Sequence, residues 1–229
     1  MFPMSNQAYL SIWCKDFPED RILERFGNFL ATVPFSTTKP EFTHLMIRAV
    51  DSLEPPLLEQ DLRAVPLDSS GIVEIAKDHL HNDCSYEVRS HWDLWAFADD
   101  PTQWRLQAQP LEIFCHGEEF DEGFWQENGH LEVNFGFEHF FTGHGGLLAP
   151  GAASNPFASS DHPIEHTFRQ WMSVSANLKE YHAKTRENIQ QLFRWIEAVE
   201  SALPVERSEL WSEGEENFEA RLDAIAAQR

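Results

Sequence analysis

Four ionisable residues alternate along one predicted strand, and their types suit acid–base and ion-pair chemistry. Residues 86–97 read Tyr-Glu-Val-Arg-Ser-His-Trp-Asp-Leu-Trp-Ala-Phe. Successive side chains of an extended strand point to opposite faces, and here one face is mostly apolar. The other face carries Glu87, Arg89, His91, Asp93, Trp95 and Phe97. A carboxylate beside a histidine is the minimum for general acid–base catalysis, whereas Arg89 beside Glu87 or Asp93 makes a plain ion pair.

Further polar residues join this face if the following strands pair in register. They are Arg105, Gln107, Gln109, Glu112 and His116, with Glu132, Asn134 and Glu138 as later additions. Three interpretations stay open: a solvated outer face, a surface for a ligand or partner, and a catalytic floor. Nearby aromatic residues favour the binding surface, because large rings are uncommon on a purely solvated face. The predicted binding residues are Glu87, Arg89, His91, Asp93, Trp95, Arg105, Glu112 and His116.

Clustered histidines are the second candidate for chemistry. The chain has 11 histidines, and five of them lie between residues 130 and 166. A metal site needs three or four converging ligands, and the short paired spacing of zinc sites is missing here. The candidate ligands are His139, His144, His162 and His166. No cofactor is predicted.

One short motif matches a catalytic pattern. His162, Glu165 and His166 have the H-x-x-E-H spacing of inverted zinc proteases. Pro163 places His162 at the start of the helix, and the chain has only an acidic tail where that family needs a further glutamate in a larger fold. We interpret the match as accidental.

The composition of the chain limits the classes of partner that it can bind. The chain has 229 residues and a net charge of −21, a sign that repels nucleic acid and anionic lipid and favours a basic protein or a cationic ligand. No apolar stretch reaches the length of a membrane span, and residues 1–7 do not resemble a signal peptide. The three cysteines have no metal-type spacing, which predicts buried free thiols in a cytoplasmic protein.

A sheet must position the polar strand. Apolar alternation predicts strands over 7–14, 42–50, 85–97, 103–109, 111–116 and 131–139. Two helices are predicted in the N-terminal half, over 22–33 and 69–80, with a helical turn between 56 and 64. The first strand, the first helix and the second strand form a β-α-β unit.

The hydrophobic period changes after residue 160. Apolar residues spaced alternately four and three apart from Ile164 to Leu203 predict one helix of about 40 residues. A last helix from Ser208 would fold back over it as a helical hairpin. The predicted fold is therefore α+β, with a mixed or mainly antiparallel sheet. The predicted units are a sheet domain (1–145), a linker rich in Gly, Ala, Ser and Pro (146–162) and the hairpin (163–229).

The sequence leads to two functional hypotheses. The first is a non-catalytic binding protein, of an inhibitor or immunity type, that uses an acidic, aromatic-lined surface. The alternative is a metal-dependent hydrolase that uses histidine and glutamate residues between 130 and 166. No motif in the sequence decides whether the protein is an enzyme.

Overall fold

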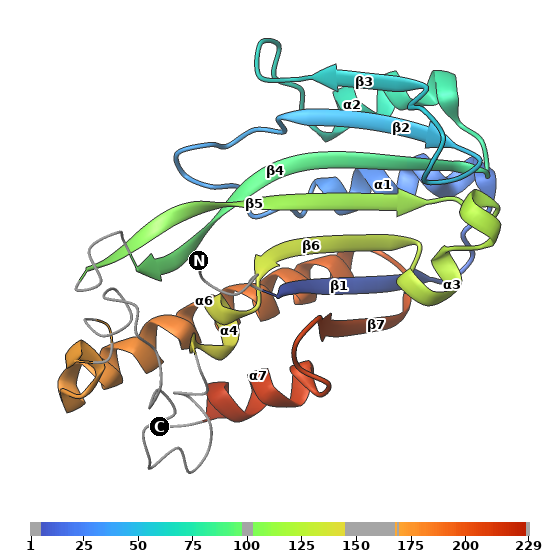
Figure 1. The fold of residues 1–229 in the computed structure, drawn as a ribbon. Coiled ribbons are helices and arrows are strands. Elements are labelled where there is room, and N and C mark those ends of the chain that lie inside the picture. Colours follow the sequence, from blue (N-terminus) through green and yellow to red (C-terminus); the bar gives the residue numbers. More distant parts are fainter. Residues whose placement is uncertain (1–5, 98–102, 145–167, 169, 228–229) are drawn as a thin grey trace.

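A seven-stranded antiparallel sheet forms the centre of the protein, in a computed structural model that describes residues 6–97, 103–144, 168 and 170–227 (Figure 1). The strands are β1 (Gln7–Cys14), β2 (His44–Ala49), β3 (Leu58–Asp61), β4 (Cys84–Phe97), β5 (Trp104–His116), β6 (Leu131–Phe137) and β7 (Val205–Ser212). They are ordered β3-β2-β4-β5-β6-β1-β7 across the sheet, and all paired neighbours are antiparallel. The α+β fold with a mainly antiparallel sheet is confirmed.

Helices cover one side of this sheet. The longer ones are α1 (Ile22–Leu30), α2 (Ser69–Ala76), α6 (Ser175–Ala202) and α7 (Phe218–Ala227). The connections between strands along the chain contain further short elements. They are the helices α3 (Trp125–Asn128) and α4 (His139–Thr142) and the 3-10 turns η1 (Glu19–Arg21), η2 (Lys77–His79) and η3 (Phe120–Glu122). Figure 1 shows α1 and α6 behind the strands, and we name the side toward the viewer the open face. Within the described residues, no helix is long and apolar enough to cross a membrane.

An apolar row crosses six strands and forms the centre of the core. Its members are paired in register and buried: Leu45, Val88, Ile113, Val133, Leu10 and Leu210. Side chains from α1, α2, α6 and α7 complete the same core. Burial of each aliphatic side chain contributes roughly 2 kcal/mol, so this row fixes the pairing register of the sheet.

Two local predictions were wrong, and a third holds for the order of its elements without the two strands being neighbours. Residues 103–109 and 111–116 form the single strand β5, which pairs with β4 as a long hairpin. The segment between 56 and 64 contains strand β3 instead of a helical turn. The predicted β-α-β unit has its two strands in one sheet, but β4, β5 and β6 lie between them.

The last predicted helix does not begin at Ser208. Residues 205–212 form β7, which pairs with β1 at the edge of the sheet, and α7 begins only at Phe218. Pairing covers the backbone of β1, which would otherwise be an open edge. α6 and α7 do contact each other, but a strand joins them. The whole predicted linker lies outside the described residues, and the division into units stays a prediction.

The long seam helix is shorter than predicted. α6 has 28 residues, and extended backbone at Val174 separates it from the helical residues 170–172. Ser173 Oγ and Asn177 Nδ2 donate to the carbonyls of Gln170 and Trp171. Such side-chain bonds compete with helical backbone bonds, which accounts for the break.

The buried side of α6 is also rotated from the predicted one. It consists of Tyr181, Thr185, Asn188, Ile189, Leu192, Trp195 and Val199, whereas the predicted positions His182 and Ile196 are only half-buried. The rotation places Asn188 against β4. Asn188 Oδ1 accepts from the Trp95 backbone N–H at 2.8 Å, and Nδ2 donates to the carbonyls of Trp95 and Phe140 at 3.0 Å.

We expect Asn188→Ala to lower the free energy of unfolding by about 2 to 4 kcal/mol, because it removes the partners of backbone groups at the end of β4. Gln190→Ala is the matched control, since Gln190 is exposed on the same helix. Urea denaturation measures both variants. Equal stability of the two would show that the contact of Asn188 with Trp95 does not hold α6 on the sheet.

Candidate functional site

The open face is the polar counterpart of the apolar row. Because side chains alternate along each strand, the neighbouring row points away from the core and contains Met46, Glu87, Phe114, Glu132 and Ser11. The next row contains His44, Arg89, Glu112, Asn134 and Tyr9. The open face therefore combines acidic and aromatic side chains directly above the core.

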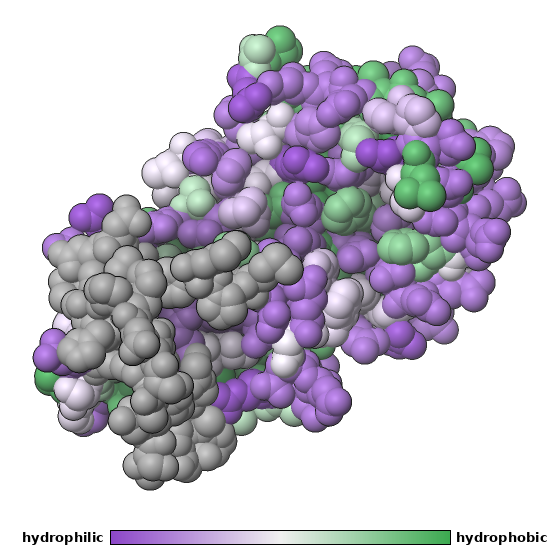
Figure 2. Space-filling model, in the orientation of Figure 1, coloured by the Kyte–Doolittle hydropathy of each residue, from purple (hydrophilic) through white to green (hydrophobic). Residues whose placement is uncertain are grey.

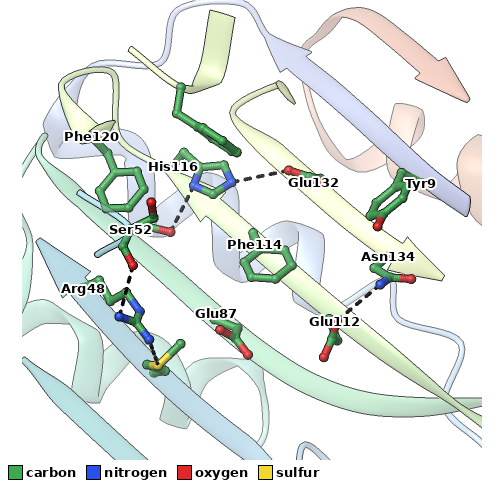
Figure 3. Close-up of a pocket in the computed structure, with 13 residues that line it drawn as sticks. Tyr9, Arg48, Ser52, Glu87, Glu112, Phe114, His116, Phe120, Glu132 and Asn134 are labelled. Atoms are coloured by element: carbon green, nitrogen blue, oxygen red, sulfur yellow. Dashed lines mark hydrogen bonds and ion pairs between the residues drawn. The ribbon is translucent and has the colours of Figure 1, made fainter. Parts of the chain in front are cut away.

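A hollow of about 300 Å³ lies on this face. Its floor is formed by Glu87, Glu112, Phe114, His116 and Glu132 (Figure 3). On the space-filling surface, apolar patches lie over the middle strands within a largely hydrophilic surround (Figure 2). This volume is at the lower end of the range for ligand pockets, so it suits one side chain or a small molecule.

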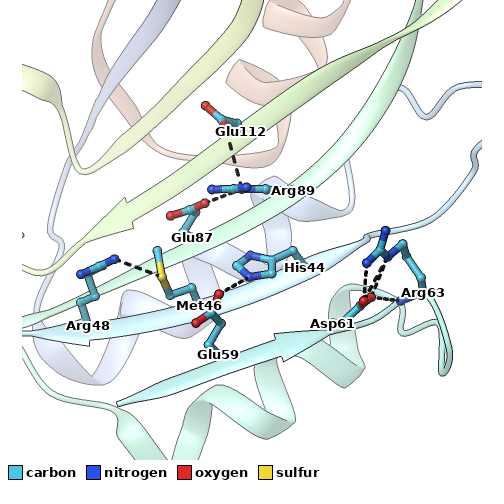
Figure 4. A network of polar contacts seen from close by, with 9 residues as sticks. All are labelled: His44, Met46, Arg48, Glu59, Asp61, Arg63, Glu87, Arg89 and Glu112. Carbon is cyan, nitrogen blue, oxygen red and sulfur yellow. Dashed lines mark hydrogen bonds and ion pairs between the residues drawn. The ribbon is translucent and has the colours of Figure 1, made fainter. Parts of the chain in front are cut away.

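Arg89 joins two of the carboxylates. Its Nε donates to Glu87 Oε1 at 2.6 Å and lies 3.7 Å from Glu112 Oε1 (Figure 4). Asn134 Nδ2 donates to Glu112 Oε2 at 3.3 Å. Glu87 is buried, so its charge requires this partner. The network fixes the positions of both carboxylates at the edge of the hollow.

His116 is buried at the end of the hollow with one nitrogen unsatisfied. Its Nδ1 lies 3.0 Å from Ser85 Oγ, while Nε2 has no hydrogen-bond partner in the described part of the chain and lies 3.8 Å from Glu132 Oε2. The imidazole is surrounded by the rings of Phe114, Phe120 and Phe124. An unsatisfied polar atom in such a place calls for an explanation, and a ligand is one.

Residues 117–129, here named the wall loop, border the hollow. A Cβ on Gly117 would lie 2.2 Å from the carbonyl oxygen of Asn82, and Gly129 has φ +89°. The loop thus begins and ends where a side chain does not fit. It carries Phe120 and Phe124 into the hollow.

Strained backbone occurs where the wall loop meets the loop after β2. Val50, Asp121 and Glu122 have positive φ of 75°, 46° and 55°. Asp121 N–H donates to the Val50 carbonyl at 2.8 Å, and Ser52, which also lines the hollow, donates its N–H to Asp121 Oδ2. Positive φ at a β-branched residue is costly and concentrates at functional sites. The rim of the hollow is therefore held in an unfavourable conformation by its surroundings.

His130 anchors the wall loop to the sheet. Its ring lies between Phe17 and Trp125, at centroid distances of 4.3 and 4.4 Å, and its Nδ1 accepts the Cys14 backbone N–H at 3.0 Å. The accepting Nδ1 requires the neutral imidazole to carry its proton on Nε2. Burial, with a smaller contribution from His116, lowers the pKa of His130 to about 4.

The order Ser85, His116, Glu132 is that of a nucleophilic triad. However, Ser85 is buried, and its strand is paired on both sides, with β2 and with β5. Backbone N–H groups within such a ladder are not free to stabilise an oxyanion. Binding suits this arrangement better than acyl transfer.

The structure brings four of the predicted site residues together and separates the other four. Glu87, Glu112 and His116 line the hollow, and Arg89 joins the first two. The other four serve different contacts. His91 Nε2 lies 3.4 Å from Lys39 Nζ, Asp93 accepts two bonds from Thr37, the Trp95 ring carries Lys184 Nζ at 3.6 Å, and Arg105 binds Gln103.

The placement of Arg105 on the polar face was wrong. Arg105 pairs with Ala96, Gln107 with Leu94 and Gln109 with Trp92, which puts all three on the other face of the hairpin. A strand without a bulge keeps its alternation throughout. Two separate strands, 103–109 and 111–116, were predicted here, whereas β5 continues through Pro110 as one strand.

The predicted metal ligands do not form a described cluster. His139 and His144 stack with their ring centroids 4.2 Å apart, and burial lowers both pKa values, that of His139 to about 3. His162 and His166, with the H-x-x-E-H motif, lie outside the described residues. Over the part of the chain that is described, no three or more His, Cys, Asp or Glu residues gather as a metal site. The three cysteines are free and buried, as predicted.

Several residues of the hollow were missed from the sequence. Ser85 and Tyr9 lie within predicted strands without a predicted role, and Phe120 and Phe124 lie between the predicted strands 111–116 and 131–139. The glycines that flank residues 117–129, with the aromatic residues between them, are the signal that could have identified the wall loop.

We expect stability to fall as the pH decreases from 6.5 toward 4. The folded pKa of His130 is below its ordinary value of 6.5, so the unfolded chain binds more protons in this window. The stabilisation is complete above pH 6.5 and is lost on acidification, on the order of 3 kcal/mol for a group shifted this far. His130→Asn should flatten the dependence of unfolding free energy on pH, whereas the exposed control His81→Asn should not. Parallel curves for all three proteins would contradict the buried neutral state of His130.

No protein-family model, no curated protein and no solved structure matches this chain. No activity is therefore suggested by likeness to another protein. Within the described residues, the hollow combines three carboxylates, an imidazole nitrogen without a hydrogen-bond partner and a set of aromatic rings.

Proposed function

We propose that the protein is a non-catalytic binding protein, of an inhibitor or immunity type, whose open face neutralises a basic partner protein. The observation that carries this proposal is the convergence of Glu87, Glu112 and Glu132, from three adjacent strands, on one aromatic-lined hollow. The net charge of −21 adds a long-range attraction for a cationic surface.

The cations of this face leave one carboxylate uncompensated. Arg89 pairs with Glu87 and Glu112. Arg48 donates to the carbonyl of Glu54 at 2.6 Å and so does not pair with an acid of the hollow. Among the described residues, only His116 lies within ion-pair distance of Glu132, at 3.8 Å, and a neutral imidazole supplies no positive charge. A partner that supplies a positive charge would complete the site.

Apolar residues on the rim suit a protein partner. Tyr9 and Trp211 stack at a centroid distance of 4.2 Å on the same face, and the loop after β2 exposes Val50, Leu53 and Leu57. Leu53 is 92% exposed. Aromatic residues with a polar surround are typical of protein interfaces. A cytoplasmic location is also proposed, because the three free thiols would stay reduced there.

We expect Glu112→Gln combined with Glu132→Gln to weaken binding of a fluorescein-labelled peptide of alternating arginine and lysine by about tenfold or more. Removal of two hydrogen-bonded charges at the centre of an interface has this magnitude. Fluorescence anisotropy measures the dissociation constant. Affinity of the unchanged protein should also fall between roughly 0.05 and roughly 0.5 M salt.

The control is Glu197→Gln combined with Glu219→Gln. Both residues are exposed on α6 and α7, and this pair changes the net charge equally. It should weaken peptide binding less than about twofold. If the two double variants have the same effect, the peptide responds only to net charge and the open face is not the binding surface.

A further inference from the structure

Resting on the proposed function, we propose that the hollow receives an arginine side chain of the basic partner. The guanidinium lies over the ring of Phe114, between the carboxylates of Glu87 and Glu132. Its aliphatic stem passes the rings of the wall loop. The hollow is thus a specific arginine pocket within a wider acidic surface.

The pairing register provides the geometry. Phe114 pairs with Glu87 on one side and with Glu132 on the other, and Figure 3 shows the ring between the two carboxylates. Neighbouring strands lie roughly 4.8 Å apart, so both side chains rise within reach of a group seated on the ring. The bond from Arg89 is made to Glu87 Oε1, and in the described structure Oε2 accepts no hydrogen bond.

His116 supplies a further acceptor. When its Nδ1 carries the proton and donates to Ser85 Oγ, Nε2 presents a lone pair beside Glu132 Oε2, 3.8 Å away. Two acceptors at this distance need a donor between them. An N–H group of a bound guanidinium satisfies both, and it explains why a nitrogen so deeply buried has no partner among the residues that the structure describes.

A guanidinium fits this site better than other cations. A metal ion needs more ligands than His116 and Glu132 provide, and no larger ligand group forms among the described residues. An ammonium is a compact, strongly hydrated charge, whereas a guanidinium is planar, stacks on a ring and donates sideways in its own plane. Acceptors on both sides of a central ring match the planar cation.

The rim indicates that the arginine belongs to a protein. Exposed Val50 and Leu53 and the stacked Tyr9 and Trp211 stand on different sides of the hollow. A small molecule of the size of the hollow would not cover them. The side chain of a folded or extended partner would fill the hollow while neighbouring residues of that partner bury the rim.

The test compares two fluorescein-labelled octapeptides, one with four arginines and one with four lysines among glycines and serines. We expect the arginine peptide to bind about tenfold more tightly. Phe114→Leu should bring the two affinities within about threefold of each other, because leucine keeps the apolar floor but removes the aromatic face. Phe137→Leu is the control, since Phe137 is an exposed ring of the same sheet outside the hollow.

Equal affinities of the unchanged protein for the two peptides would overturn the arginine pocket, and so would a Phe114→Leu variant that keeps the preference. If both peptides bind equally and both respond to Glu132→Gln, the proposed function stands and this inference fails. If neither peptide binds, the proposed function fails as well. A second readout needs no variant. Addition of N-acetyl-arginine amide should shift the Nε2 resonance of His116 in ¹⁵N NMR spectra. An unshifted resonance at a saturating concentration of this compound would exclude contact with His116.

Discussion

The buried row from Leu45 through Val88 and Ile113 to Leu210 is the constraint on which both faces of the protein depend. Strand alternation has a period of two, so a slip of one residue would exchange the faces. Such a slip would move Glu87 and Glu132 into the core, at a cost of several kcal/mol for each unpaired charge. Core packing and the acidic hollow therefore specify the same register, and neither can form without the other.

The length of the β4–β5 hairpin creates a problem that α6 solves. β2 pairs with β4 only as far as Arg89, so the backbone beyond it lacks a strand neighbour on that side. Polar side chains of the helix replace that neighbour: Asn188 binds both backbone groups of Trp95, and Gln191 donates to the Asp93 carbonyl at 3.0 Å. Polar residues occur on the sheet-facing side of this helix because they supply hydrogen-bond partners to backbone groups at the end of β4. They also fix the orientation of α6 about its axis.

Local alternation was sufficient to predict part of the site. Glu87, Arg89, Glu112 and His116 follow from period-two patterns in two strands whose apolar faces are unambiguous. Arg105 was misplaced because the segments on either side of Pro110 were predicted as two separate strands, each with its own alternation. The structure accommodates this proline because β6 pairs only with residues 112–115 of β5, so no ladder bond is lost at Pro110 on that side. Strand β7 has only one buried residue, Leu210, so pairing with β1 decides its conformation and the local pattern does not.

The charges around the hollow favour a cation over an anion. Its arginine neighbours are already engaged, Arg89 by two glutamates and Arg48 by backbone carbonyls, so an entering anion would meet carboxylates that neither of these two arginines is free to offset. Rings on the floor and in the wall loop disfavour a fully hydrated ion and reward a cation with a flat, weakly hydrated face. The backbone hydrogen bond from Asp121 to Val50 holds this rim in place before any partner arrives, despite the positive φ of both residues. A pre-formed rim lowers the ordering cost of association, which the proposed binding of a basic partner would require.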